Sequence, residues 1–497
     1  MNDNIVWIKR FSKRPLLDNK NIIDLLKYEN KYSLWWFLEW LMVYGKFHFL
    51  NLDSILQNPS HKNFKNNVAV YFKFGRLIFR KIIWNIFSFW TKKFDKSKKS
   101  ICMISTLNQQ LYDQKKEKMV YGDRFIPIIN HISQDFNIFL IDIPYKNEFG
   151  FRAFWNGVKN KNILFFPIEH FMGFKEIHQA YKSFILYRLI WKKIKYSNSL
   201  NFLDNNIKRH IINNFDFFFS IYLFIILLEL EAYKSFFRKF KVSLVCTLDS
   251  FGPSGFKPRI AFDGHVIGIQ PGAMENGSLE YISNLDELKT YPLVDYWLVF
   301  DENIKNNFVK SKHFPKEKIL IVGNYKKDDI FYKIKNYRLK ISNEAVLLIG
   351  QDFHDKQEYS AFLKEAFLFL DKIPTIKKII RPDPAERDIA TYLNLIQEYN
   401  IQNVNISFKE DVIFPLVRSK FVISSFSTVL FEADLLGKNP VILDVFNKGY
   451  RYSVPNIAST NNHRGLLNIY KTHNPTKYKK IKPDVYKNIA GVIKILK

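Results

Sequence analysis

Short apolar segments alternate with helical patterns in two successive series along this chain, and no other feature limits the possible folds as strongly. The first series contains "SICMIST" (100–106), a helical pattern near 120–134, "NIFLIDI" (137–143), "NILFFPI" (162–168) and, after a long helical stretch, "VSLVCTLD" (242–249) and "HVIGIQ" (265–270). Strands separated by helices pair in parallel through right-handed crossovers. This series predicts a Rossmann-like domain over 98–325, with a helical insertion at about 174–240.

The second series has the same alternation. It contains "AVLLIGQ" (345–351), a helix near 357–371, "IKKIIRPDP" (376–384), a helix near 386–399, "NVNISF" (403–408), "FVISSFS" (421–427), a helix from about 428 and "NPVILD" (439–444). A chain of 497 residues is long enough for two or three domains. We therefore predict an α/β fold with two Rossmann-like, doubly wound domains, the second over 340–497.

Residues 1–97 differ in character and predict a helical, basic and aromatic appendage. In "VYFKFGRLIFRKIIWNIFSFWTKKF" (70–94), Phe79, Ile83 and Trp90 fall at helical spacing, beside a row of Lys and Arg. This pattern is typical of a helix that lies in a membrane interface. It is equally typical of a helix that packs on the next domain by its aromatic face, so both interpretations stay open.

The net charge is +28, which favours nucleic acid, anionic lipid or phosphorylated ligands as partners. An AT-rich genome accounts for part of the lysine excess. The aromatic residues sit in apolar runs and are not interleaved with arginine, which argues against nucleic acid. We therefore expect a phosphorylated ligand and an anionic membrane surface as partners, and no nucleic acid.

The cysteines and the apolar runs indicate a cytoplasmic chain. Cys102 and Cys246 lie in strand-like segments without a CxxC motif or a histidine cluster, which predicts buried, reduced thiols and no metal. The start "MNDNIVWIKRFSKR" lacks the apolar core of a signal peptide. The run "FFFSIYLFIILL" (217–228) is shorter than the roughly 20 residues that span a bilayer, so we expect a buried helix.

Ligands of doubly wound sheets bind beyond the carboxyl ends of the strands, and three polar loops follow strands here. Ser425, Ser427 and Thr428 lie where a strand leads into a helix; this arrangement binds phosphate, and it is also an ordinary helix cap. Arg381 opens "RPDPAERD", on a turn stiffened by proline. Its guanidinium suits phosphate, although an arginine before a proline-initiated helix is equally common.

The third loop, "IGIQPGAMENGSLEY" (267–281), carries two carboxylates after a predicted strand. A carboxylate near an apolar cleft acquires a raised pKa that suits a general base, which makes Glu275 and Glu280 candidates. Gly272 and Gly277 would let the backbone approach a ligand closely. A solvated loop with incidental acids is the alternative.

These loops occur in an order that resembles the two-Rossmann (GT-B) glycosyltransferases of bacterial surface-polysaccharide synthesis, over roughly residues 100–450. Gly268 to Gly272 match a "GIQHG"-like turn, and "IVGNY" (321–325) matches a strand ending in "VxGN". Arg381 to Pro384 match a "KPHP"-like turn, and Ser424 to Thr428 match a Ser/Thr-rich helix start. Glu432 falls where many such enzymes carry a ribose-binding acid.

Two groups within that superfamily are similar to this chain. "ENGSLEY" (275–281) resembles the D/E-D/E-G motif of bacterial sialyltransferases, whose acid deprotonates the acceptor hydroxyl. "GIQPG" resembles the CDP-glycerol glycerophosphotransferases, which carry a histidine at the position of Pro271. Asn276, Pro271 and Asp383 depart from the motifs, so either catalysis rests on Glu275 or the chain binds without catalysing.

The resemblance implies an inverting, metal-independent transfer with no cofactor, of a sugar from a nucleotide donor onto a surface glycan or lipid-linked glycan. It implies a nonulosonic acid from a CMP donor, with glycerol-phosphate transfer and a non-catalytic, basic, membrane-binding protein as alternatives. The implied location is the cytoplasm, peripheral at the inner face of the cell membrane. The implied site comprises Glu275 as catalytic base, Arg381, Asp383, Ser424, Ser425, Ser427, Thr428 and Glu432 for the donor, and Gln270, Gly272, Asn276, Gly277 and Glu280 on the acceptor side.

Overall fold

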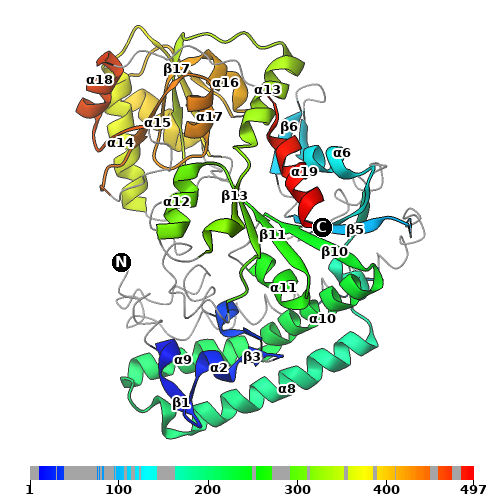
Figure 1. The fold of residues 1–497 in the computed structure, drawn as a ribbon. Helices are drawn as coiled ribbons and strands as arrows, with labels where there is room; N and C mark the ends of the chain where they lie inside the picture. The colour runs from blue at the N-terminus through cyan, green and yellow to red at the C-terminus, as the bar shows by residue number, and fades with distance from the viewer. Residues whose placement is uncertain are drawn as a thin grey trace.

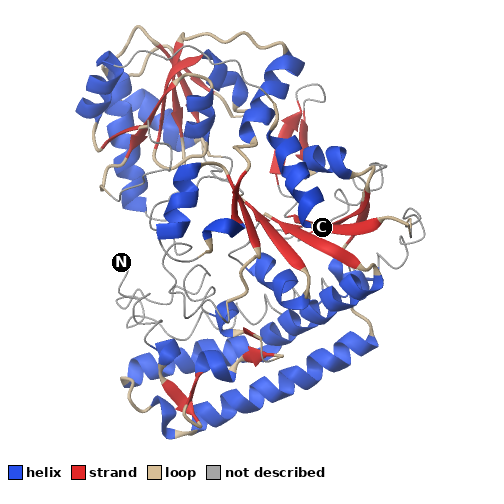
Figure 2. Ribbon diagram, in the orientation of Figure 1, coloured by secondary structure: helices blue, strands red, loops and turns tan. Residues whose placement is uncertain are grey.

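A computed structural model shows two parallel sheets, each covered by helices, with a pair of long helices below the first (Figure 1). Figure 2 shows the same view by secondary structure. The structure describes residues 11–29, 31–38, 75, 78, 81–82, 95, 97–105, 109–113, 118–122, 125–142, 163–248, 253–270, 291–310, 314–351, 356–383, 389–408, 410–447, 457–472 and 483–497.

The first sheet has seven strands, and all of its strand pairs are parallel. In chain order they are β5 (Lys99–Ser105), β8 (Phe136–Asp142), β9 (Leu164–Phe166), β10 (Val242–Thr247), β11 (His265–Ile269), β12 (Tyr296–Val299) and β13 (Ile319–Ile321). Their spatial order is β13-β12-β11-β10-β5-β8-β9. The chain therefore starts in the middle, builds one half outward to β9 and returns to build the other half.

Helices cover this sheet and extend below it. They are α6 (Ile126–Ile132), α8 (Phe174–Tyr196), α9 (Asn205–Phe217), α10 (Leu223–Lys239), α11 (Pro253–Ala261) and α12 (Glu302–Lys310), with short turns at Ile168–Phe171, Asn198–Leu200 and Lys316–Lys318 and a π-helical segment at Phe218–Tyr222. Residues 120–122, expected at the start of a helix, instead belong to β7 (Lys118–Gly122), which pairs antiparallel with β6 (Gln109–Asp113).

The long helix Ile207–Lys239 is the one helix in the described part of the chain that is long and apolar enough to cross a membrane, and half of its most apolar window is buried. Its second half, α10, contributes buried residues such as Leu227, Leu230 and Phe236 to the core of the first domain. It also carries two buried carboxylates, Glu229 and Glu231. These contacts are those of a core helix, as expected from the sequence.

The second sheet has six strands, also all parallel, in the order β16-β15-β14-β17-β18-β19. The strands are β14 (Ala345–Ile349), β15 (Lys377–Arg381), β16 (Val404–Ile406), β17 (Ser419–Ser424), β18 (Asn439–Leu443) and β19 (Ala458–Thr460). The helices are α13 (Lys326–Tyr337), α14 (Lys356–Asp371), α15 (Ala390–Glu398), α16 (Ile413–Arg418), α17 (Val429–Leu435) and α18 (His463–Thr472).

Strand β14 shows why an uninterrupted apolar run is needed at the centre of this sheet. Its alternate residues Ala345, Leu347 and Ile349 pack in the core beneath α16 and α17, while Val346 and Leu348 pack in the core beneath α14 and α15. Both faces of a central parallel strand are covered, so every position must be apolar.

The domains are joined through α13 and a final helix, α19 (Val485–Leu496). Ile330 of α13 lies in the second domain's core, whereas Ile489 and Ile493 of α19 lie in the first domain's core, against α6. Asp328 of α13 accepts a hydrogen bond from the Tyr486 backbone N–H at 2.9 Å. The sequence predicts that residues 340–497 form the second domain. The apolar face of α19 instead packs on the first domain.

The described part of the appendage mixes short helices with two small antiparallel sheets. These elements are β1 (Pro15–Leu17), β2 (Lys20–Asn21), α2 (Ile22–Leu25), β3 (Lys27–Tyr28) and β4 (Tyr32–Ser33). Trp35 and Phe37 are buried in the core of the first domain. This portion therefore packs on the first domain. It contains short strands as well as helices, whereas the sequence predicts a helical appendage.

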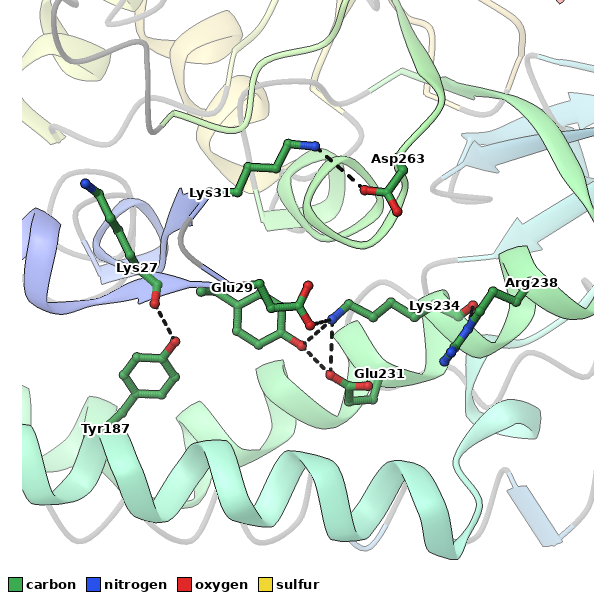
Figure 3. Close-up of polar contacts among 9 residues, drawn as sticks. Lys27, Glu29, Lys31, Tyr187, Glu231, Lys234, Arg238 and Asp263 are labelled. Atoms are coloured by element: carbon green, nitrogen blue, oxygen red, sulfur yellow. Dashed lines mark hydrogen bonds and ion pairs between the residues drawn. The ribbon is translucent and has the colours of Figure 1, made fainter.

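A buried polar cluster fixes β3 to α10 (Figure 3). The Tyr28 hydroxyl donates to Glu231, and Lys234 Nζ lies 2.9 Å from that hydroxyl and pairs with Glu29. Burial, followed by the Glu231 hydrogen bond, raises the pKa of Tyr28 far above its usual value. The tyrosine therefore stays protonated and continues to donate to the carboxylate.

Candidate functional site

The second sheet has a topological switch point between β14 and β17. After β14 the chain moves outward through β15 to β16, and it then returns to β17 on the other side of β14. The helices that follow, α14 and α17, pack on opposite faces of the sheet. Ligands of doubly wound sheets bind in the crevice that such diverging loops leave at the carboxyl edge.

A buried glutamine connects the two loops at this switch point. Gln351 lies two residues beyond the end of β14, and its side-chain Oε1 accepts a hydrogen bond from the Phe426 backbone N–H at 3.1 Å. The loop after β17 is therefore held at the end of β14. Gln351 is not among the residues predicted from the sequence. A signal for it exists, because Gln351 follows the apolar run "LLIG" in the same way as Gln270 follows "VIGI".

The Ser/Thr segment predicted to bind phosphate lies in this loop, and its hydroxyls differ in role. Ser424 Oγ donates to the Ile349 carbonyl oxygen at 3.1 Å, which ties β17 to β14. Ser425 is buried, and Ser427 Oγ accepts from the Val429 N–H at 3.3 Å at the start of α17. Thr428 is exposed. Ser424 thus acts within the sheet, while Ser427 and Thr428 stand at its edge.

Arg381 ends β15, on the other side of β14 from this segment, and its guanidinium is half-buried. It donates to the Ser407 carbonyl oxygen at 3.0 Å and lies 3.4 Å from Ser407 Oγ, which in turn donates to Glu410 at 2.7 Å. Burial lowers the pKa of Arg381, and the nearby acids Asp411, Glu410 and Asp383 oppose that shift. Two strand spacings, about 10 Å, separate the ends of β15 and β17.

Glu432, predicted to contact ribose, forms an ion pair with Lys326 of α13, with the Lys326 Nζ 3.1 Å from Glu432 Oε1. The carboxylate is nearly buried, with 7% of its side chain exposed. The same connector helix makes a second ion pair with this domain, from Lys333 to Asp411 at 2.8 Å. Glu432 therefore fastens α17 to the connector between the two domains.

On the first sheet, Gln270 lies at the carboxyl end of β11 and is fully buried. Its Oε1 accepts from the Phe300 N–H at 2.9 Å, and its backbone N–H donates to the Leu298 carbonyl oxygen at 3.0 Å. Gln270 thus joins the ends of β11 and β12. The other predicted acceptor-side residues, Gly272, Asn276, Gly277 and Glu280, and the predicted base Glu275 lie outside the described residues.

The "VGN" turn leads from the first sheet into the connector helix. Gly323 adopts φ +95°, and a Cβ there would lie 3.0 Å from a Val485 methyl group of α19. Asn324 Oδ1 accepts from the Lys326 N–H at 3.0 Å and caps α13. The turn predicted from the resemblance therefore requires glycine because it is left-handed and close-packed.

Among the described residues, no group of three or more His, Cys, Asp or Glu side chains is placed to hold a metal ion. Cys102 and Cys246 are both buried and unbonded to each other, and burial raises the pKa of each thiol. The prediction of buried, reduced thiols is confirmed for these two residues.

No protein-family model matches the chain, and no curated protein has a similar sequence. Among solved structures, the UDP-GlcNAc 2-epimerase from Methanocaldococcus jannaschii is 12% identical, with a TM-score of 0.46, over 80% of this chain and 99% of that chain. A glycosyltransferase from Rickettsia africae is 12% identical, with a TM-score of 0.42, over 80% and 93%. The wall teichoic acid polymerase TagF is 11% identical, with a TM-score of 0.38, over 88% and 98%.

At these identities and TM-scores the likenesses assign neither a family nor an activity to this chain. The strand orders of the two sheets confirm the α/β fold with two doubly wound, Rossmann-like sheets that the sequence predicts. The GT-B resemblance remains an interpretation of the sequence motifs. The finer resemblance to sialyltransferases stays a prediction.

Proposed function

We propose that this chain is a glycosyltransferase that moves a sugar from a nucleotide donor onto a surface glycan or a lipid-linked glycan. The supporting observation is the carboxyl edge of the second sheet, where Gln351, Arg381 and Ser427 follow or end three adjacent strands around a switch point. This edge is where doubly wound sheets bind nucleotides. The enzyme would act in the cytoplasm, peripheral at the inner face of the membrane, to which the net charge of +28 attracts it.

In this proposal the donor phosphates lie between β15 and β17. The Ser427 and Thr428 hydroxyls and the backbone N–H groups beside them would donate to phosphate oxygens on one side of the leaving group, and Arg381 would pair with an oxygen on the other side. Asp383 lies close enough to Arg381 to oppose the lowering of its pKa by burial, and it would line the donor side of the site. Ser424 and the buried Ser425 shape the loop, and Glu432 accepts from the ribose hydroxyls.

On the acceptor side, Glu275 would deprotonate the attacking hydroxyl. Inverting transfer needs a base on the acceptor and stabilisation of the departing phosphate, and it requires no metal when side chains supply that stabilisation. The sequence motif around Glu275 favours a nonulosonic acid carried on CMP. The alternative is transfer of glycerol phosphate from CDP-glycerol. Comparing the affinities for CMP and CDP tests between the two.

The test is a calorimetric titration of the full chain with CMP, CDP, UDP and GDP. We expect CMP to bind most tightly and Arg381→Ala to weaken its binding by about 10- to 150-fold, because a hydrogen bond to a charged group contributes roughly 1.5–3 kcal/mol. Ser427→Ala combined with Thr428→Val should weaken binding less. The effects of the two changes should be non-additive, because both groups hold one ligand.

Lys377→Ala is the matched control, because Lys377 is an exposed cation at the opposite end of β15. Thermal unfolding of Arg381→Ala separates loss of the ligand contact from loss of the Ser407 hydrogen bond. Equal affinity in wild type and Arg381→Ala would remove the phosphate contact from the proposal. Tighter binding of CDP than of CMP would favour the glycerol-phosphate alternative.

A second prediction separates the two roles of Glu432. Glu432→Gln and Lys326→Met should each lower the free energy of unfolding by roughly 1–3 kcal/mol. Each change removes one member of the ion pair and leaves the other, partly buried, charge without its partner. Only Glu432→Gln should also abolish the preference for CMP over its 2′,3′-dideoxy analogue, measured by the same calorimetry. If both variants retain that preference, Glu432 has the structural role alone.

A further inference from the structure

The helix α8 (Phe174–Tyr196) has an outer face rich in exposed apolar side chains. It lies along the lower edge of the molecule in Figure 1, beyond α10. Its most exposed apolar residue is Phe174, at 94%, and Tyr196 at the other end is 79% exposed. The remaining exposed apolar residues of this helix are Ile177, Tyr181, Leu186 and Leu189. They recur at three- to five-residue spacing over most of the helix, which is about 34 Å long.

The inner face of α8 is firmly packed, so the outward side chains are not exposed by loose docking. Ala180, Tyr187, Trp191 and Ile194 are buried in the first domain's core. The Tyr187 hydroxyl donates to the Lys27 carbonyl oxygen at 2.9 Å, and Trp191 Nε1 donates to Asp216 Oδ1 at 2.7 Å. The helix therefore presents a fixed outer surface.

That outer surface carries only positive charge. Its exposed cations are Lys175, Lys182, Arg188, Lys192 and Lys193. The single acid in the helix, Glu176, is buried and faces inward, where it accepts hydrogen bonds from the Gly173 N–H at 2.9 Å and from the Ser235 hydroxyl. Basic and apolar side chains are thus interleaved on one face without a compensating carboxylate.

The start of α8 lies beside the basic, aromatic segment of the appendage. Lys81 Nζ donates to the Met172 carbonyl oxygen, two residues before the helix begins. Ile78 and Ile82, also described, are 48% and 54% exposed. Two further exposed apolar side chains therefore belong to a segment that contacts the start of α8.

We propose that the outer face of α8 docks on an anionic lipid bilayer, with its apolar side chains at the headgroup boundary and its lysines on the lipid phosphates. Interfacial helices combine these two classes of side chain on their lipid-facing surface. The charge is complementary to an anionic leaflet and extends over the whole helix length. Nucleic acid would use the cations but would leave the exposed Phe, Ile and Leu side chains in water. The proposal is independent of the donor chemistry proposed above.

The experiment is co-sedimentation of the full chain with vesicles of phosphatidylcholine alone or with phosphatidylglycerol added. We expect wild type to bind the anionic vesicles at physiological salt. Lys182, Lys192 and Lys193 changed together to Gln should weaken that binding by about 100-fold, since each cation near such a surface contributes about fivefold. Phe174→Ser with Leu189→Ser should weaken it at low salt as well, because this change removes the apolar contact.

The matched control replaces Lys364, Lys377 and Lys471 with Gln, an equal change of charge at exposed sites of the second domain. It should bind vesicles nearly as wild type does; an equal loss would show attraction by net charge alone and overturn the proposal. Failure of wild type to sediment with anionic vesicles would also overturn it. The proposal would also be overturned if analytical ultracentrifugation showed that the α8 substitutions dissociate a dimer while vesicle binding stays unchanged. Nucleotide calorimetry without vesicles reports separately on the proposed function.

Discussion

Replacing Glu275 with Gln is expected to lower turnover by about 10²–10⁴ while leaving nucleotide affinity nearly unchanged. Glutamine keeps the size of the side chain but removes the group that accepts the proton. The acceptor hydroxyl would then have to attack without deprotonation. Turnover is measured at a saturating concentration of the sugar donor that carries the nucleotide identified by calorimetry. The rate then reports on the chemical step, while calorimetry reports on binding.

Glu280→Gln is the matched control, because it makes the same change five residues further along the sequence. Wild-type turnover in Glu275→Gln, with loss in Glu280→Gln, would transfer the role to Glu280. Asp263 is a poorer substitute. It precedes β11 (His265–Ile269) and so lies at the amino end of that strand, opposite the edge where Gln270 leads into the loop.

Replacing Lys438 with Met is expected to lower the free energy of unfolding by about 2–4 kcal/mol at neutral pH. Lys438 is 3% exposed, and its Nζ donates to the Ser342 carbonyl oxygen at 2.6 Å, to Asn343 Oδ1 at 2.9 Å and to the Val417 carbonyl oxygen at 3.0 Å. Methionine fills the space but leaves these buried acceptors without a donor, at a cost of about 1–3 kcal/mol for each group that water does not reach.

The same lysine predicts a pH dependence. Burial lowers the pKa of Lys438 from 10.5 to about 8. Between these values the unfolded chain binds more protons than the folded one, so the contribution of Lys438 to stability rises with pH, by about 1 kcal/mol from pH 8 to pH 9. Urea unfolding of wild type and Lys438→Met at both pH values measures the difference. Lys377→Met, at an exposed site, should keep both the wild-type stability and its rise between pH 8 and pH 9. A rise that persists unchanged in Lys438→Met would contradict the assignment.

The alternation of apolar runs predicted both central strands and their neighbours because a buried parallel strand must be apolar at every position, as β14 is. The same rule fails for short edge strands. β19 (Ala458–Thr460) is only partly buried and carries Ser and Thr, so nothing in its pattern separates it from a loop. Residues 120–122 resemble the start of a helix because a strand of five residues is too short to show a distinctive period.

Of the candidate site, the sequence placed Arg381 and the Ser/Thr segment at the correct edge, since position after a strand follows from strand order. It did not predict which of their polar groups form hydrogen bonds within the protein. The Arg381 bond to Ser407, the Ser424 bond to Ile349 and the ion pair between Lys326 and Glu432 all join residues from separate elements. Such pairings depend on the packing of helices against the sheets, which residue spacing along the chain does not encode.

The return of α19 to the first sheet has a consequence for biosynthesis. Ile489 and Ile493 complete a core that otherwise consists of residues before position 326, so that core includes side chains translated after the entire second sheet. While the ribosome makes the second domain, the surface of α6 that α19 later covers stays open to solvent. The nascent first domain therefore carries an unfinished apolar surface for the time needed to add about 160 residues, which is many seconds at bacterial or eukaryotic elongation rates. The time for which this surface is exposed during synthesis thus depends on where α19 lies in the chain order.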